Sequence, residues 1–286
     1  MRIVSTKREL RAALVASGGT PRVLVPTMGA LHEGHAELLR QARQLAGSSG
    51  VVVASVFLNP TQFDNSGDLA TYPRTPDQDM NLCDECGVDI LFMPDPQEMY
   101  RPDRSISVEE NALSRVLCGA SRPGHFAGVC LVVSKLFNLV QPTDAIFGKK
   151  DYQQLAILRR LVRDLDFPIN LHGAEIVRER DGLAVSSRNV RLTPEHRAAA
   201  PAIYAGLQAA GSALCAGSSP AVVCAELRAK LEALPGVRAD YVELVDAESL
   251  VPVTEAVQET SHLLLAVAAW FGEVRLIDNL EILPRV

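Results

Sequence analysis

Short apolar runs alternate with amphipathic stretches through residues 1–176. Val51–Phe57 (VVVASVF) is rich in β-branched residues, which predicts a buried strand. Tyr152–Leu165 (YQQLAILRRLVRDL) repeats leucines at helical spacing, which predicts an amphipathic helix. Because strands and helices of this kind follow each other in turn, the pattern predicts an α/β domain with a Rossmann-like parallel sheet.

The other elements of this domain follow from the same periodicities. Further strands are expected at Arg22–Thr27, Asp89–Pro94, Asp144–Gly148 and Ile169–Val177. Helices are expected at Gly34–Ala46, from Thr75 onward, at Val108–Leu117 and at Phe126–Val140.

The pattern changes after Val177. A polar loop at Arg178–Asn189 precedes alanine-rich helices at Thr193–Gly217 and Ala221–Leu234. The last three apolar runs, Asp240–Asp246, His262–Phe271 and Glu273–Ile282, predict a small antiparallel sheet. We therefore expect a first domain at residues 1–176 and a smaller α+β domain at residues 177–286.

Polar motifs follow three of the predicted parallel strands. They are Pro26–His35 (PTMGALHEGH), Leu58–Phe63 (LNPTQF) and Gly148–Gln154 (GKKDYQQ). Ligands of open parallel sheets bind beyond the carboxyl ends of the strands. This coincidence indicates a ligand site at that edge of the sheet.

His32 and His35 are three residues apart at the start of a predicted helix. Their imidazoles should share one face, beside main-chain N–H groups at the positive end of the helix dipole. This arrangement suits phosphate. A metal site that uses both histidines, and a simple pair of surface histidines, remain open on these residues alone, although zinc would need a third ligand.

Two further segments could hold an anion. Lys149 and Lys150 follow a strand and a glycine, and a lysine there is a point charge suited to polyphosphate. Ser186–Asn189 (SSRN) offers hydroxyl and guanidinium donors on a loop that could close over a ligand. A solvated lysine pair and a hydrophilic hinge are the alternatives. The chain contains neither a Walker A motif nor a G-x-G-x-x-G motif.

Composition narrows the class of protein. The chain has 286 residues, 48% of them hydrophobic, and a net charge of −6, so we expect no unspecific binding to nucleic acid or anionic membranes. The apolar runs are too short to span a bilayer. Six cysteines without a recognisable signal peptide predict a reduced, cytoplasmic protein. Cys83 and Cys86 form a C-x-x-C, but no second pair completes a zinc site.

Together these motifs resemble a known family. The histidine pair and the serine–arginine loop are similar to those of adenylyl-transferring enzymes with a HIGH-type motif. Six segments resemble the pantothenate synthetase family in their order and spacing: PTMGALHEGH, LNPTQF, YPRT, RPGHFAGV, GKKDYQQL and DGLAVSSRN. Two segments nearer the end of the chain, LVDAESL and AAWFGEVRLIDN, are similar to that family as well. The resemblance covers nearly the whole chain.

The resemblance implies a ligase of the coenzyme A pathway that joins (R)-pantoate to β-alanine. ATP would adenylate pantoate with release of pyrophosphate, and β-alanine would then displace AMP to form pantothenate. The family's properties imply Mg²⁺ carried by the ATP phosphates, with no firm protein ligand, and a homodimer with no nucleic-acid or membrane partner. They also imply that residues 1–176 bind ATP and pantoate and that residues 177–286 act as a lid.

Site residues carried over from the family are as follows. ATP is expected to contact Met28, Gly29, Ala30, Leu31, His32, Glu33, Gly34, His35, Gly148, Lys149, Lys150, Asp151, Val177, Val185, Ser186, Ser187 and Arg188. The implied catalytic residues are His35, His32, Lys150, Ser186, Ser187 and Arg188. Pantoate and β-alanine are expected to contact Gln62, Gln154, Asn59, Arg122 and His125. His35 is the expected proton donor, and Val177 is expected against the adenine.

Three positions depart from the family's usual pattern: Lys149 stands where glutamate is usual, Thr61 where methionine is frequent, and Gln78 where an acidic residue is common. Any metal or hydrogen-bonding role near Gln78 would then fall to Asp77 or Asp79. Another nucleotidyltransferase, a zinc hydrolase that uses the two histidines, and a nucleotide sensor without turnover are the competing functions.

Overall fold

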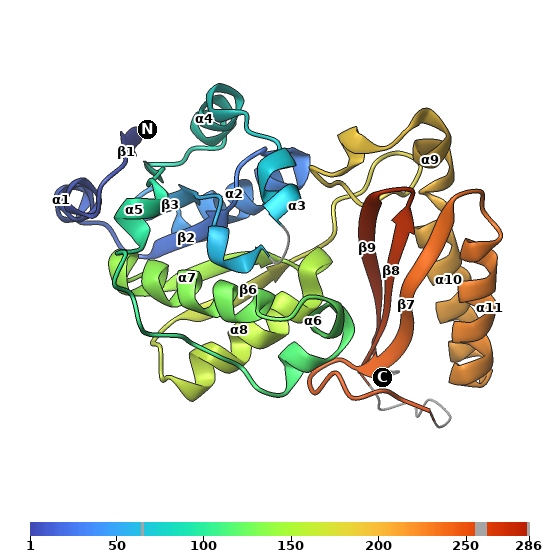
Figure 1. The fold of residues 1–286 in the computed structure, drawn as a ribbon. Helices are drawn as coiled ribbons and strands as arrows, with labels where there is room; N and C mark the ends of the chain where they lie inside the picture. The colour runs from blue at the N-terminus through green and yellow to red at the C-terminus, as the bar shows by residue number, and fades with distance from the viewer. Residues whose placement is uncertain (64–65, 255–261, 285–286) are drawn as a thin grey trace. The chain divides into compact units, whose positions relative to one another are not determined.

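In the computed structural model, which describes residues 1–63, 66–254 and 262–284, the chain forms two compact units (Figure 1). The first unit comprises residues 1–112, 122–149 and 154–175, and the second comprises residues 113–121, 150–153 and 176–286. The predicted boundary at residue 177 stays a prediction.

Six parallel strands form the sheet of the first unit. They are β1 (Arg2–Val4), β2 (Arg22–Thr27), β3 (Val51–Val56), β4 (Ile90–Phe92), β5 (Asp144–Gly148) and β6 (Asn170–Ala174). Their order is β1-β4-β3-β2-β5-β6. The chain moves outward from β2 through β3 to β4 and then returns to the other side of β2 with β5. The point where the strand order reverses therefore lies between β2 and β5, which is where doubly wound sheets bind ligands.

Helices cover both faces of this sheet. On one face, α2 (Glu33–Ala46) and α4 (Pro76–Glu85) pack on alternate residues of the strands, and Leu39 and Cys83 are fully buried there. The opposite face carries α1 (Lys7–Ser17), α7 (His125–Val140) and α8 (Tyr152–Asp164), and α7 and α8 lie on the other side of the sheet from α4 (Figure 1). The Rossmann-like architecture predicted for this part of the chain is confirmed.

Short helices complete the connections in the two units. They are η1 (Pro60–Gln62), α3 (Ser66–Thr71), α5 (Pro96–Met99), η2 (Leu113–Arg115), α6 (Leu117–Ser121), η3 (Lys149–Asp151) and η4 (Asn189–Arg191).

The second unit contains an antiparallel sheet with two helices on one face. Its strands are β7 (Val237–Asp246), β8 (Leu263–Phe271) and β9 (Val274–Ile282), in the order β7-β8-β9. α9 (Pro194–Ala199) precedes α10 (Ala202–Cys215) and α11 (Pro220–Glu232), and the last two pack against the sheet. Leu207, Leu227 and Phe271 are buried in this core. The predicted α+β organisation is confirmed.

The helix predicted at Val108–Leu117 is wrong. From Val108 to Ala112 the chain has no regular structure, and it then forms only η2 and α6. The amide of Gln153 donates hydrogen bonds to the carbonyl groups of Leu113 and Val116, each at 2.7 Å. Leu117 also adopts a positive φ of 46°, which a continuing helix does not allow. Contacts from a distant residue thus replace the hydrogen bonds of a helix.

Sequence periodicity missed the first elements and one helix break. β1 and α1 were not predicted, because neither shows a long apolar run. The single helix expected at Thr193–Gly217 is divided into α9 and α10 at Ala200–Pro201. Proline lacks the N–H group that a helix interior requires, which accounts for the division. Among the described residues, no helix is both long enough and apolar enough to cross a membrane.

Candidate active site

The three predicted motifs begin at the ends of three neighbouring strands. β3, β2 and β5 are adjacent in the sheet and parallel, so their carboxyl ends lie at one edge. Asn59 follows β3, Met28 follows β2 and Lys149 follows β5. The motifs therefore flank the point where the strand order reverses.

The Met28–Leu31 loop is held by a carboxylate from α4. Asp79 is 2% exposed, and its two oxygens accept hydrogen bonds from the N–H groups of Ala30 (3.0 Å) and Leu31 (2.7 Å). Thr75 Oγ1 donates to the same carboxylate at 3.0 Å. Gly29 and Ala30 both have positive φ angles, 86° and 50°, so the clamp stabilises a backbone shape that Ala30 rarely adopts. Asp79 thus has a hydrogen-bonding role.

His32 and His35 lie together at the first turn of α2. Their ring centroids are 4.1 Å apart, as the spacing of the two residues predicts. His32 Nδ1 accepts a hydrogen bond from Gly34 N, and His35 Nδ1 accepts one from His32 N, both at 3.2 Å. Each histidine therefore caps the helix.

The capping bonds also determine the neutral tautomers of both rings. An Nδ1 atom that accepts a hydrogen bond carries no proton, so the neutral imidazole carries its proton on Nε2. Each ring then has an Nε2–H group that can donate to an anion while Nδ1 caps the helix. Capping and phosphate binding are compatible in this geometry.

An amide network occupies the end of β3. Asn59 Nδ2 donates to Gln62 Oε1 (2.9 Å) and to the Gly128 carbonyl (3.1 Å). Gln62 Nε2 in turn contacts Met28 Sδ at 2.9 Å. η1 approaches α7 so closely that a side chain at Gly128 would overlap the Thr61 carbonyl group. The structure thus joins Asn59, Gln62 and Met28 through direct contacts.

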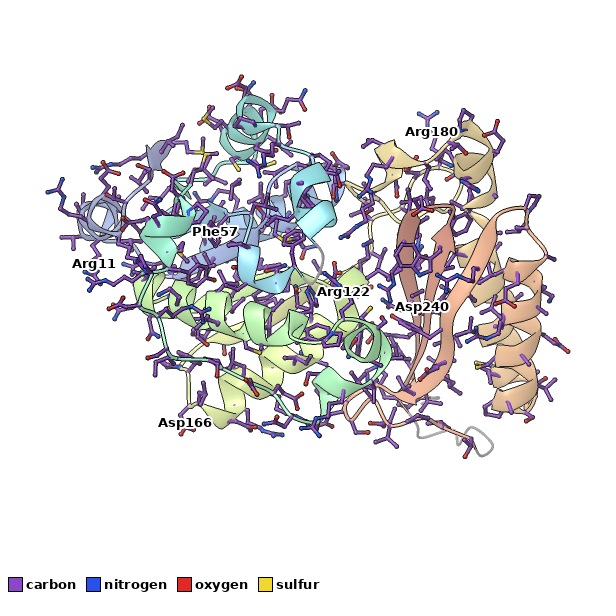
Figure 2. All side chains as sticks on the ribbon, in the orientation of Figure 1. Arg11, Phe57, Arg122, Asp166, Arg180 and Asp240 are labelled. Atoms are coloured by element: carbon purple, nitrogen blue, oxygen red, sulfur yellow. The ribbon has the colours of Figure 1, made fainter. Side chains whose placement is uncertain are left out.

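Arg122, which is labelled in Figure 2, and His125, the first residue of α7, both contact the Gln62 carbonyl oxygen at the end of η1. His125 Nδ1 lies 2.7 Å from the Gln62 carbonyl oxygen, which can only accept, so this ring carries its proton on Nδ1. Arg122 Nη1 lies 3.2 Å from His125 Nε2 and can donate to it. The tautomer of His125 is therefore the opposite of those of His32 and His35.

Tyr100 belongs to this cluster and was not identified from the sequence. Its hydroxyl group donates to Asn59 Oδ1 at 2.7 Å, and its ring centroid is 6.0 Å from that of Phe57, the residue after β3. Burial raises the pKa of Tyr100, so the hydroxyl group keeps its proton. Tyr100 follows β4 and α5, and the rule that site residues follow strand ends could have identified it.

The remaining predicted site residues occupy two regions. Gln154 is half-buried in α8, in the first unit. Lys150, Asp151, Val177, Val185 and Ser186–Arg188 belong to the second unit. Val185 N donates to the Val177 carbonyl group at 3.0 Å, so these two valines are neighbours, and Ser186 Oγ accepts from Arg188 N at 3.3 Å.

Metal ligation has little support in the part of the chain that the structure describes. Residues 1–63, 66–254 and 262–284 contain no group of three or more His, Cys, Asp or Glu side chains that could hold a metal ion. Cys83 and Cys86 are free and buried. Burial, followed by the nearby Asp79 charge, raises the pKa of Cys83 to about 12, which disfavours the thiolate that zinc requires.

A comparison with protein families matches the model of pantoate–β-alanine ligase to residues 2–281. The chain belongs to this family. A pantothenate synthetase of Akkermansia muciniphila is 59% identical over 284 residues, which cover 99% of this chain and all of that protein. A Thermotoga neapolitana pantothenate synthetase is 48% identical, covering 98% of this chain and 99% of that one.

Solved structures of the pantoate–β-alanine ligase family have the same fold. The pantothenate synthetase of Thermus thermophilus has a TM-score of 0.91 and 47% identity, and the match covers 99% of this chain and 100% of that one. A Francisella tularensis member, complexed with β-γ ATP and β-alanine, has a TM-score of 0.81 and 30% identity over 98% and 97% of the two chains.

The three departures from the family's usual residues can now be located. Lys149 forms an ion pair with Glu175, so its added positive charge is partly balanced. Thr61 Oγ1 donates to Asn59 Oδ1 at 2.9 Å and lies 3.4 Å from the Tyr100 hydroxyl. Gln78 is exposed, whereas Asp79, the next residue, makes the loop contacts. The amide network thus includes the Thr61 hydroxyl group.

Proposed function

We propose that this family member condenses (R)-pantoate with β-alanine in an ATP-dependent reaction that proceeds through pantoyl-adenylate. One observation carries the proposal most directly. The histidine pair, the amide network and the Lys149–Lys150 segment begin at three adjacent strand ends, on both sides of the point where the strand order reverses. A nucleotide and a small polar acid would find donors of the required kinds there.

The proposed first step forms an acyl phosphate bond. A pantoate carboxylate oxygen attacks the α-phosphorus of ATP, and the bond from that phosphorus to the bridging oxygen of the β-phosphate breaks, which releases pyrophosphate. Negative charge grows on the phosphoryl oxygens, so positioned donors accelerate the step more than a protein nucleophile would. We assign this role to His32 and His35 through their Nε2–H groups, to Lys150, and to Ser186, Ser187 and Arg188.

The second step uses the free amine of β-alanine. The amine attacks the carbonyl carbon of the adenylate, loses a proton, and expels AMP. Holding the two reactants in place supplies much of the acceleration of such a step. The Francisella tularensis relative, whose structure is a complex with both β-alanine and β-γ ATP, supports the choice of substrates.

Pantoate is assigned to the amide network. Asn59 uses both its oxygen and its amide group in contacts with the protein, so we assign it the placement of Gln62 rather than the main substrate contact. Gln62, Gln154, Arg122 and His125 remain the proposed contacts for the hydroxyl groups and the carboxylate. Met28 contacts Gln62 and is itself assigned to ATP, which supports the proposal that ATP and pantoate meet beside these two residues.

Mg²⁺ is proposed as the ion that accompanies ATP. Mg²⁺ commonly keeps several waters and binds substrate phosphates rather than a cage made only of protein. The described residues, which offer no cluster of three ligands, fit that mode of binding. The ion would neutralise part of the phosphate charge. A homodimer, a cytoplasmic location and a lid role for residues 177–286 complete the proposal.

Isotope labelling tests the function and the intermediate together. Purified chain, ATP, MgCl₂ and pantoate should release pyrophosphate before β-alanine is added, and β-alanine should then give AMP and pantothenate. With ¹⁸O in the pantoate carboxylate, one labelled oxygen should appear in AMP. Label in inorganic phosphate, together with ADP, would contradict the adenylate. Turnover without ATP that a chelator abolishes would favour a hydrolase, and ATP binding without turnover would favour a sensor.

A further inference from the structure

Two adjacent polar residues of β9, Asp278 and Asn279, are buried in the second unit. They are 4% and 6% exposed, respectively. Neighbouring residues of a strand project from opposite faces of its sheet. The two side chains therefore reach two different segments of the second unit.

Asp278 holds the start of the Val177–Val185 hairpin. Its carboxylate accepts two hydrogen bonds from Arg178, from Nη1 at 2.7 Å and from Nη2 at 2.9 Å. Arg178 also donates to the Gly182 carbonyl group (3.1 Å), and its guanidinium lies 3.5 Å from the ring centroid of Tyr204. A two-point contact of this kind restricts the orientation of the arginine as well as its position.

The hairpin leads directly into Ser186–Arg188. Arg178 pairs with Ala184 across the hairpin. After the loop, Asn189 donates to the Ala184 carbonyl group (3.1 Å) and to Glu179 (3.0 Å), and its N–H group donates to the Ser186 carbonyl group (3.0 Å). The Ser186–Arg188 loop is thus tied at both ends to the hairpin that Asp278 holds.

Asn279 contacts the other segment. Its Nδ2 group donates to the main-chain carbonyl of Lys150 at 3.1 Å. Two residues further along β9, Glu281 lies 3.3 Å from the Tyr152 hydroxyl. This contact uses the main chain of Lys150, whose ammonium group is the part that we assign to the phosphates.

We propose that Asp278 and Asn279 are positioning residues that set the two phosphate-binding segments of the second unit from one strand. This inference rests on the proposed function, because it assigns Lys150 and Ser186–Arg188 to ATP. We assign neither residue a contact with substrate. Asp278 acts through Arg178 and the hairpin, and Asn279 acts through the Lys150 main chain.

Asp278→Asn, Asn279→Ala and a control variant test the proposal. Asp240 accepts from Arg275 of β9 at 2.7 and 3.0 Å, which makes a second Asp–Arg pair in the same unit with no assigned role in ATP binding. Asp240→Asn therefore measures what the loss of such a pair does by itself. Pantoate-dependent pyrophosphate release is measured well below each variant's unfolding midpoint. Amide hydrogen exchange is measured without ligand.

The expected pattern separates positioning from stability. Asp278→Asn and Asn279→Ala should lower kcat of adenylation roughly 10- to 100-fold, the loss that a small misplacement of reacting groups causes. Asp240→Asn should lower only the unfolding midpoint. In Asp278→Asn the amides of Val177–Val185 should exchange faster, and in Asn279→Ala those of residues 150–153 should do so.

Three results would overturn the proposal. A wild-type kcat in both folded variants would exclude a positioning role. An equal loss of kcat in Asp240→Asn would mean that the loss comes from lower stability alone. Unchanged amide hydrogen exchange in Val177–Val185 and in residues 150–153 would also exclude the proposal, without any assay of turnover. An inactive wild-type chain whose exchange pattern still responds as expected would instead contradict the proposed function.

Discussion

Asp79 Oδ1 accepts a 2.7 Å hydrogen bond from the N–H group of Leu31, and this contact joins α4 to the loop that carries the histidine pair. The second oxygen of Asp79 accepts from Ala30, whose φ is positive. The carboxylate therefore offsets the strain of the loop and orients the first turn of α2. A buried side chain of α4 thus holds the loop that leads directly into the two histidines.

We expect Asp79→Asn to lower both stability and adenylation. An amide has only one acceptor oxygen, so one of the two main-chain N–H groups would face an NH₂ group. The free energy of unfolding should fall by roughly 1–3 kcal/mol, and kcat for pyrophosphate release should fall about 10-fold or more. Asp77→Asn, an exposed change on the same helix, is the matched control for urea unfolding and turnover. Equal activity in the two variants would exclude the clamp as a determinant of catalysis.

Substitution of His32 can separate helix capping from phosphate binding. His32→Ala removes both functions, whereas asparagine is among the best N-cap residues and lacks the Nε2–H group. We expect His32→Ala to cost about 1 kcal/mol of stability and His32→Asn to recover most of it. Both variants should lose about 10²-fold in adenylation, the usual loss for one removed donor. Recovery of activity in His32→Asn would mean that capping is the whole role of His32.

Loss of the Lys150 side chain should lower the rate of adenylation more than loss of the Lys149 side chain. Lys150→Ala removes a charge assigned to the phosphates, and we expect pyrophosphate release to fall about 10²-fold. Lys149 is engaged with Glu175, so Lys149→Ala should cause a smaller loss. The comparison is made by measuring kcat and KM for ATP in both variants. A larger loss in Lys149→Ala would transfer the assignment to that residue.

Thiol reactivity should follow burial. Cys215 is exposed, whereas burial raises the pKa values of Cys83 and Cys130 to about 12 each. At pH 8 the folded chain should therefore react rapidly with a thiol reagent at Cys215, and Cys83 and Cys130 should react only after unfolding. Cys215→Ser should remove the rapid phase, as peptide mapping of the labelled chain can check. Labelling of Cys83 in the folded chain would contradict its buried position.

Asp144 should make stability depend on pH. Burial raises the pKa of Asp144. Hydrogen bonds to its carboxylate lower the pKa by more, and the strongest of them comes from His172, whose Nε2 lies 2.8 Å from Asp144 Oδ1. The net shift of the pKa is therefore downward. A carboxylate with a lowered pKa stabilises the fold above its unfolded pKa of about 3.9, and this stabilisation is lost as the pH falls through the folded value. Asp144→Asn should cost about 1 kcal/mol at pH 7, a difference that should disappear at low pH in urea unfolding. A constant difference at all pH values would contradict this linkage.

The sequence by itself determined the type and order of most elements and the pairing of His32 with His35, because periodicity and spacing are local properties of the chain. It also indicated that the site lies at strand ends, since polar motifs follow the apolar runs directly. The roles of the individual site residues came from the resemblance to the family and stay proposals.

Only the tertiary structure decided which strands are neighbours, and so which motifs begin side by side. It also decided that Gln153 would prevent a helix at Val108–Leu117, that Asp79 would hold the Ala30–Leu31 loop, and that Asp278 would hold Arg178. These three contacts join residues that are 40, 49 and 100 positions apart, respectively. Local periodicity carries no information about such pairs, because burial and hydrogen bonding between distant segments determine them only when the chain is folded.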